Sequence, residues 1–371
     1  MEHAQIDVKT SVAIAAFERP PDHARDELVN PLAEAWRKCE SAASLPTQCH
    51  AFVASLADTM LADAEWEFVG TADTAGGDAL LPLCRDRGYF ARWRMAGARE
   101  VFEPGDGLCG TPEAAVALAA ALASDSRPLC FARMPADSLL IPALRGALRG
   151  RGWLSVRPAV PCPTIALDET WAEPEAHFNS GRRSDFRRAA RRAQQMGAVA
   201  YEVLSPSEAE FDRLFDEAIA VELESWKRAA GTAMAVDRAK EEFFRAYFRR
   251  TARLGQLRIA FLRIDGRAVA MQLALEWHGR FWLFKIGYDE AYAKCSPGTL
   301  LMLHTLGWAA RRGLAGYELL GGVEPWIAAF WTRDGRPCVQ LRSYPLGLRG
   351  AIALLSDASS TLVKRVRRRF G

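Results

Sequence analysis

The residues best suited to chemistry lie around the end of one apolar stretch, residues 317–320. Glu318 stands inside that stretch, and Glu324 follows the glycine pair that ends it. Two carboxylates beside a strand end and a tight turn can take a proton from an amine or return one. Tyr288 ends the preceding predicted strand and is the candidate acid. The alternatives are an edge-exposed strand position for Glu318, a dipole-favoured helix start for Glu324, and packing with a polar tip for Tyr288.

A second candidate is a helix start that suits an anion. It is the run Ser296-Pro297-Gly298-Thr299-Leu300. Serine caps helices well, and proline fits the first helical position because its missing N–H would be unpaired there. We expect the N–H groups of Gly298, Thr299 and Leu300 to point out of the helix and, with the helix dipole, to suit a pyrophosphate. The alternative is an ordinary helix start after a loop.

Two strands and the helix between them must position these groups. We predict a strand at 281–288, a loop, and a helix at 298–312 that ends at Gly313. Glycine just past the last turn is a common helix end. The strand at 317–320 then follows, so both candidate sites depend on one strand–helix–strand unit.

The order of elements repeats along the chain. Each half is predicted to contain strands, then helix, strand, helix and strand, which favours two related domains packed together over one large domain. We predict a loosely ordered lead-in at 1–30, an N-terminal domain at 31–172, a C-terminal domain at 173–346, and a basic helix or tail at 347–371.

Turn dipeptides and apolar periodicity predict the remaining elements. Asp265-Gly266 and His278-Gly279 separate β-rich runs and predict hairpins. In the N-terminal half we predict strands at 65–70, 79–84, 89–96, 129–134 and 153–158, and helices at 32–44, 50–64, 112–124 and 137–150. In the C-terminal half we predict further strands at 199–204, 257–264, 268–277 and 337–344, and helices at 181–196, 206–228, 236–253 and 324–331.

Composition narrows the class of protein. The 371 residues are 50% hydrophobic and 25% charged, which excludes a disordered chain, a collagen-like chain and a membrane bundle. The eight cysteines and six histidines are scattered without CxxC, HExxH or HxH spacing, so we expect no metal site. The N-terminal residues lack the pattern of a signal peptide, and we expect a cytoplasmic protein with reduced thiols.

Basic residues gather in two short segments. Residues 181–192 carry six arginines and one aspartate, and residues 364–369 carry five basic residues and no acid. The remainder is mildly acidic, so we expect no DNA binding. The Arg182–Arg192 helix either binds the phosphates of a nucleotide-bearing ligand or is a solvated face. Residues 348–370 alternate apolar and basic positions and, if helical, would place a basic end on an anionic membrane; a packing helix with a solvated tail is the alternative.

These features together resemble a known family. Residues 180–345 resemble the GNAT-fold acyltransferase domain of the cellulose-biosynthesis acetyltransferase-like family, whose members resemble a fused pair of GNAT folds related to Fem-type peptidyltransferases. Residues 32–170 resemble that family's N-terminal half. The resemblance rests on the basic helix, the hairpin 264–270 and the motifs Gly287-Tyr288-Asp289-Glu290-Ala291-Tyr292, Ser296-Pro297-Gly298, Tyr317-Glu318-Leu319-Leu320-Gly321-Gly322 and Glu324-Pro325-Trp326.

The resemblance implies a fold, a co-substrate and an activity. The fold would be α+β, in three α/β layers, with two tandem GNAT-like domains and mixed, mostly antiparallel sheets. Acetyl-CoA or another acyl-CoA would lie between strands 281–288 and 317–320, with its pyrophosphate on 296–300. The activity would be direct N-acyl transfer to a small-molecule or glycan amine, such as an amino sugar or polysaccharide precursor. Glu318 or Glu324 would be the base.

The sequence also departs from that family. Ser296-Pro297-Gly298 matches the usual CoA loop only in part, Glu318 stands where aspartate is common, and Ile327 stands where lysine is usual. Two alternatives therefore stay open. One is a Fem-like transferase that uses aminoacyl-tRNA, although residues 206–253 lack a sustained heptad. The other is a non-catalytic scaffold in polysaccharide biosynthesis.

Overall fold

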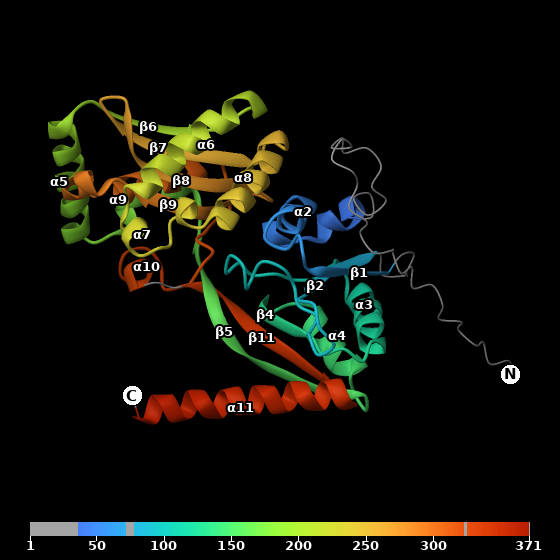
Figure 1. Cartoon of the computed structure of the whole chain (residues 1–371). Helices are drawn as coiled ribbons and strands as arrows, with labels where there is room; N and C mark the ends of the chain where they lie inside the picture. The colour runs from blue at the N-terminus through green and yellow to red at the C-terminus, as the bar shows by residue number, and fades with distance from the viewer. Residues whose placement is uncertain (1–35, 72–77, 323–324, 371) are drawn as a thin grey trace. The chain divides into compact units, whose positions relative to one another are not determined.

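The computed structural model describes residues 36–71, 78–322 and 325–370, with residues 325, 326 and 361–370 as backbone only. The predicted lead-in at 1–30 and the candidate base Glu324 lie outside the described residues. The chain forms two compact units: unit 1 comprises residues up to 57, 61–160 and 337 onward, and unit 2 comprises 58–60 and 161–336 (Figure 1). The chain passes between them within β5 (Gly152–Ala166) and returns within β11 (Gly335–Pro345).

Unit 1 contains a small antiparallel sheet and a second group of strands. The small sheet has the order β1 (Glu65–Thr71), β2 (Ala79–Arg85), β3 (Leu108–Cys109). β4 (Cys130–Pro135) pairs antiparallel with β11. The helices are α2 (His50–Asp58), α3 (Pro112–Ser124), α4 (Leu140–Ala147) and α11 (Leu348–Phe370), with short turns η1 (Glu40–Ala42) and η2 (Pro46–Gln48). Side chains from β2, α3, β4 and α4 share one core, including Leu81, Leu118, Phe131 and Leu144.

The predicted strand at 89–96 is wrong, because this segment forms only isolated bridges. The guanidinium group of Arg127 donates hydrogen bonds to the carbonyl oxygens of Tyr89 (3.1 Å) and Ala91 (2.9 Å). Buried backbone groups need a partner, and here a side chain supplies what a neighbouring strand would otherwise provide. The segment therefore stays irregular.

Unit 2 is built on one sheet. Its strands are β6 (Val199–Leu204), β7 (Leu257–Ile264), β8 (Arg267–Trp277), β9 (Arg280–Tyr288) and β10 (Gly316–Glu318), followed by the end of β5. β9 and β10 pair in parallel, and the other neighbours pair antiparallel. At both Asp265-Gly266 and His278-Gly279 the two residues have positive φ, as a type I′ hairpin turn requires. The two predicted hairpins are confirmed.

Helices cover both faces of this sheet. α5 (Ser180–Met196) and α9 (Pro297–Arg311) pack on one face, where Leu283 of β9 meets Met302. The neighbouring residue, Phe284, points to the other face and meets Tyr247 and Phe248 of α8 (Arg238–Arg253). The remaining helical segments are η3 (Glu169–Ala172), η4 (Pro174–His177), α6 (Glu208–Leu223), α7 (Trp226–Ala229), η5 (Met234–Val236), η6 (Glu290–Cys295) and α10 (Pro325–Phe330).

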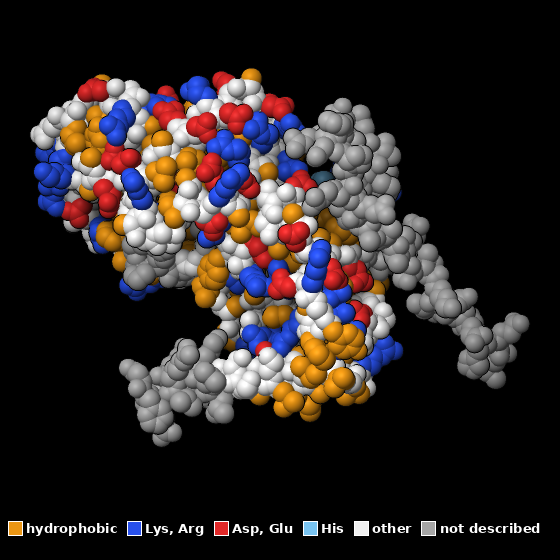
Figure 2. Space-filling view, viewed as in Figure 1, with side chains coloured by type: hydrophobic (Ala, Val, Ile, Leu, Met, Phe, Trp, Pro, Cys, Tyr) orange, Lys and Arg blue, Asp and Glu red, His pale blue; other side chains and the backbone are white. Residues whose placement is uncertain are grey.

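The outer surfaces of α6 and α8 are charged. Figure 2 shows acidic and basic side chains interspersed over this region. Arg249 of α8 pairs with Asp212 of α6, and Arg245 reaches Asp216 at 2.7 Å. The outer surfaces of these two helices are therefore solvated, and their ion pairs are of the exposed kind that adds little stability.

The fold class expected from the sequence is confirmed as α+β with mixed, mostly antiparallel sheets. None of the described helices combines the length and the apolar character that crossing a bilayer requires. In the same part of the chain, no three His, Cys, Asp or Glu side chains gather as a metal site.

Candidate active site

β9 and β10 are paired over three residues and then part. Their register runs from Arg280 opposite Gly316 to Trp282 opposite Glu318. Beyond this point Leu319 donates its N–H to the carbonyl oxygen of Pro163 in β5, at 3.0 Å. The chain after β10 thus follows β5, while β9 continues to Tyr288 paired only with β8. The edge of β9 beyond Trp282 is left unpaired by β10.

The parting strands end in a sharp turn. Leu320 and Gly321 both have positive φ, at 43° and 49°. Leu320 is buried, and a branched residue in this backbone region is an uncommon outlier that surrounding structure must enforce. The turn carries the chain off the sheet directly after the strand.

A bulge changes the direction of side chains along the free edge of β9. Leu273 of β8 faces Lys285, while Ala274 faces Leu283, so Phe284 is the extra residue. Bulges re-aim side chains and are common next to active sites. Here Phe284 and Lys285 both reach α8, where the Lys285 ammonium lies 4.2 Å from the ring centroid of Phe244. No pattern in the sequence signalled this bulge.

At the start of α9, two backbone N–H groups that we expected to be free already donate hydrogen bonds. Ser296 has a left-handed conformation (φ 48°), and its side chain makes no capping bond. Its carbonyl oxygen instead accepts the N–H groups of Thr299 (3.0 Å) and Leu300 (3.2 Å). The expectation that three amides are free is therefore wrong for these two. Among the described residues, no acceptor is found for the Gly298 N–H.

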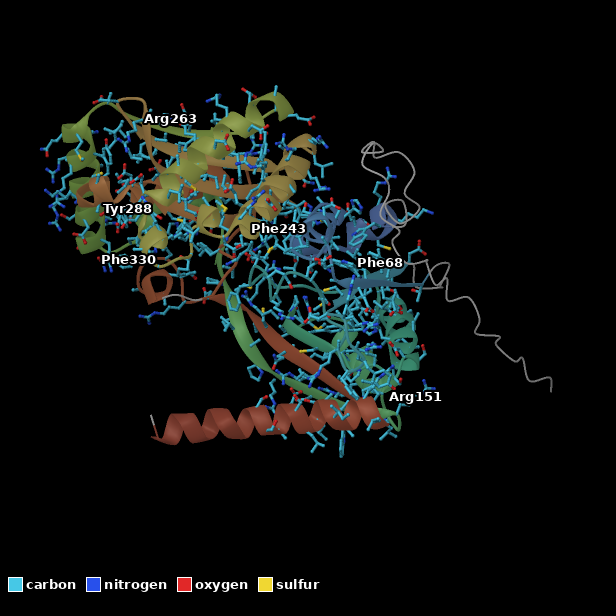
Figure 3. All side chains as sticks on the ribbon, in the orientation of Figure 1. Phe68, Arg151, Phe243, Arg263, Tyr288 and Phe330 are labelled. Atoms are coloured by element: carbon cyan, nitrogen blue, oxygen red, sulfur yellow. The ribbon has the colours of Figure 1, made fainter. Side chains whose placement is uncertain are left out.

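Tyr288 lies against the start of α9. A Cβ added to Gly298 would come within 3.3 Å of Cδ1 of Tyr288, so only glycine allows this approach without displacement. The ring of Trp226 in α7 lies 5.0 Å from the Tyr288 ring (centroid distance; Figure 3 labels Tyr288). Burial raises the pKa of Tyr288 above its usual value, and the Glu290 carboxylate raises it further. The hydroxyl is therefore neutral at physiological pH and can donate a hydrogen bond.

Glu318 is an ion-paired core residue. Its side chain is 1% exposed, which excludes the edge-exposed alternative. Oε1 accepts from Nε of Arg280 at 2.6 Å, and Nε of Arg336 lies 3.5 Å from Oε2. A Cβ on Gly316 would overlap the Arg280 guanidinium, so the glycine makes room for this pair. The carboxylate is therefore already engaged by the Arg280 guanidinium.

A buried polar group fixes α9 to the sheet. The hydroxyl of Tyr317 lies 3.0 Å from that of Thr305 in α9 and donates to Oε1 of Gln272 in β8 at 3.1 Å. All three side chains are buried, and a fully satisfied network of this kind favours one arrangement. It ties the middle of α9 to β8 and β10.

Sequence reasoning missed Glu222, which closes the other side of β9. It is buried at the end of α6, and Nζ of Lys227 and the N–H of Met234 each donate to its carboxylate at 2.8 Å. A Cβ on Gly287 would come within 3.0 Å of Cα of Glu222. The signal available in the sequence was a glutamate on an apolar helix face. Glu222 positions α6, α7 and η5 next to the end of β9.

Two further residues lie near the site without completing it. Ile327 is buried in the core with Phe281 and Tyr317, so this position packs and carries no cation. Arg182 of α5 lies over the ring of Phe330, 3.9 Å from its centroid (Figure 3 labels Phe330). This side chain of the Arg182–Arg192 helix therefore has a partner within unit 2.

A polar cavity of unit 2 lies away from this site. It is bounded by β6 and α6, and Arg263 stands in its wall (Figure 3). The guanidinium group pairs with Glu217 and Glu202, which raises the pKa of Arg263. Arg263, Glu202 and Glu217 are thus paired with one another, and we place no chemistry there.

Comparison with known proteins agrees with this geometry. Residues 180–326 match the acetyltransferase (GNAT) domain family. No curated protein matches the chain in sequence. Three solved structures share the fold over most of the chain. FemX aligns with a TM-score of 0.57 and 11% identity, over 88% of this chain and 98% of FemX. A DUF2156 domain of a putative lysylphosphatidylglycerol synthetase from Agrobacterium fabrum aligns with a TM-score of 0.52 and 14% identity, over 88% of this chain and 95% of that one, and a protein of unknown function from Bacteroides thetaiotaomicron aligns with a TM-score of 0.52 and 12% identity, over 84% and 95% of the two chains.

The GNAT match covers the elements that build the site. It spans β6 to β10, with α5, α6, α8 and α9. The likeness to solved structures shows the fold alone. The roles of Glu318, Glu324, Tyr288 and residues 296–300 stay predictions.

We predict that Glu222→Ala destabilises unit 2 by about 3 kcal/mol, because the Lys227 ammonium and the Met234 amide lose their shared partner. Urea unfolding measures this. Glu224→Ala is the matched control, since Glu224 is exposed two residues away and should shift stability by less than about 0.5 kcal/mol. Equal losses in the two variants would show that the Glu222 pair contributes nothing.

Proposed function

We propose that the protein is an acyl-CoA-dependent N-acyltransferase that transfers an acyl group directly to an amine. The observation that carries this proposal is the parting of β9 and β10 beside the start of α9. An unpaired strand edge offers backbone N–H and C=O groups to the amides of a pantetheine arm. The helix start at 296–300 offers the Gly298 N–H and the helix dipole to a pyrophosphate.

In this proposal the amine nitrogen attacks the thioester carbonyl, the C–N bond forms and the C–S bond breaks. The ammonium form of such an amine has a pKa of about 10 and must first lose a proton. Glu318 or Glu324 would accept that proton, directly or through water. Backbone N–H groups on the free edge of β9 would stabilise the oxyanion. Tyr288, whose hydroxyl is protonated at physiological pH, would donate a proton toward the leaving thiolate and regain one from solvent.

The acceptor we propose is an amino sugar or another amine-bearing polysaccharide precursor in the cytoplasm. This assignment rests on the family resemblance of the sequence motifs. The non-catalytic scaffold is the alternative suggested by Ile327, and absence of any acyl transfer would support it.

The Fem-like alternative, in which aminoacyl-tRNA is the donor, is supported by the fold likeness to FemX and by nothing in the site. Residues 206–253 form the separate helices α6, α7 and α8 instead of one long hairpin. Acyl-CoA is therefore the donor we propose.

We predict that acetyl-CoA raises the melting temperature and that Gly298→Asp weakens its binding at least about tenfold. The new carboxylate repels the pyrophosphate, and its Cβ presses on Tyr288. Isothermal titration calorimetry measures the affinity. Gly146→Asp places the same charge on α4 of unit 1, where an added Cβ meets no atom within 4 Å, and should bind like the wild type. Equal affinity in the wild type and Gly298→Asp would show that the pyrophosphate lies elsewhere.

We predict different effects for the two glutamates. Glu318→Gln should lower the melting temperature, because its carboxylate pairs with Arg280. Glu324→Gln should lower kcat about 100-fold or more by removing the base. Tyr288→Phe should lower kcat at unchanged KM. Release of the CoA thiol, followed with a thiol reagent, measures turnover, and unchanged release in both glutamine variants would remove both carboxylates from catalysis.

A further inference from the structure

The outer face of α11 in unit 1 is apolar. Leu348 and Leu355 are 65% and 68% exposed, and the exposed Ala351 and Ala358 complete a stripe at helical spacing. Surface helices usually turn such a stripe toward the core and their polar face to water. α11 presents the reverse arrangement.

The inner face of α11 is firmly held, so this orientation is fixed. Asp357 pairs with Arg92 and with Arg342, each at 2.7 Å, and accepts a hydrogen bond from the hydroxyl of Tyr344 at 2.8 Å. Ala353 is buried beside it. If α11 rotated to bury Leu348 and Leu355, the Asp357 carboxylate would lose its ion pairs with two arginines.

The apolar surface continues onto the neighbouring strand. Leu346, which precedes α11, is 72% exposed, and its N–H donates to the carbonyl oxygen of Arg151 at 2.8 Å. Trp153 lies in β5, two residues after Arg151, and is 71% exposed. Figure 2 shows hydrophobic side chains gathered at the end of unit 1 where α11 begins, and Figure 3 labels Arg151 there.

Two aromatic rings extend the same region. The guanidinium group of Arg349 lies over Tyr89, 4.3 Å from the ring centroid. Tyr89 and its neighbour Phe90 are both exposed. Aromatic side chains with one apolar and one polar side suit a boundary between water and lipid.

The charge of this end is almost entirely basic. Residues 138–160 and 337–360 together contain six arginines and one acidic residue, Asp357, which is already paired. Arg145, Arg149, Arg151 and Arg157 are exposed, and the sequence continues with five basic residues within 364–369. Such a surface is complementary to an anionic partner.

We propose that this surface docks unit 1 on an anionic lipid bilayer. We call it the α11 face and define it by Trp153, Leu346, Leu348, Leu355 and the arginines around them. A nucleic acid would pair with the arginines but offers no complement to exposed leucines, whereas a bilayer takes both. The inference is independent of the proposed acyl transfer.

Vesicle sedimentation of the full chain tests this proposal. We expect pelleting with vesicles that contain phosphatidylglycerol at low salt, release at high salt, and little pelleting with pure phosphatidylcholine. The variant Leu348→Ser/Leu355→Ser should lose binding about tenfold or more. Val116→Ser/Leu254→Ser is the matched control, because it removes two equally exposed apolar side chains elsewhere and should bind like the wild type.

Three results would overturn the proposal. The first is a full-length protein that stays in the supernatant with anionic vesicles at low salt. The second is pelleting that the serine substitutions at 348 and 355 leave unchanged while melting temperatures also stay unchanged. The third is a wild-type protein that does not bind vesicles but self-associates in light scattering, with the self-association lost in Leu348→Ser/Leu355→Ser. That result would assign the α11 face to a second copy of the chain.

Discussion

The parting of β10 from β9 after Glu318 determines the shape of the proposed site. Beyond Glu318 the chain continues its ladder with β5, where the N–H of Leu319 is donated to Pro163, whereas the register with β9 ends. The edge of β9 from Leu283 to Tyr288 is therefore not paired with β10. The turn at Leu320 carries the chain away from this edge, and Gly298 at the start of α9 approaches Tyr288 at its end.

The surrounding contacts hold the divergence open from both faces of the sheet. On one face the Tyr317 hydroxyl ties α9 to β8 and β10. On the other, Glu222 packs against Gly287 and holds the chain after α6 through Lys227. The ion pair of Glu318 with Arg280 joins β10 to the start of β9, where the strands still pair. In the proposed site the binding groups would come from backbone edges, and the side chains would mainly keep those edges apart.

Local patterns in the sequence predicted most helices and strands. The features that they did not predict depend on contacts between residues far apart in the sequence. Alternation and turn dipeptides gave the hairpins of β7, β8 and β9, and proline and glycine marked the ends of α9 within a residue. The irregular path of 89–96 depends on Arg127, and the partner of Glu318 lies 38 residues away at Arg280. The bulge at Phe284 leaves no mark in composition or spacing. Residue types therefore pointed to a candidate site, whereas the hydrogen bonds around it required the fold.

Hydrogen–deuterium exchange with and without acetyl-CoA tests the central claim most directly, because it reports on backbone amides along the strand edge itself. We expect slower exchange in peptides covering 283–288 and 296–300 when acetyl-CoA is added, with α8 and unit 1 unchanged. Protection absent from both segments, or confined to the polar cavity at β6 and α6, would contradict a donor site between β9 and β10.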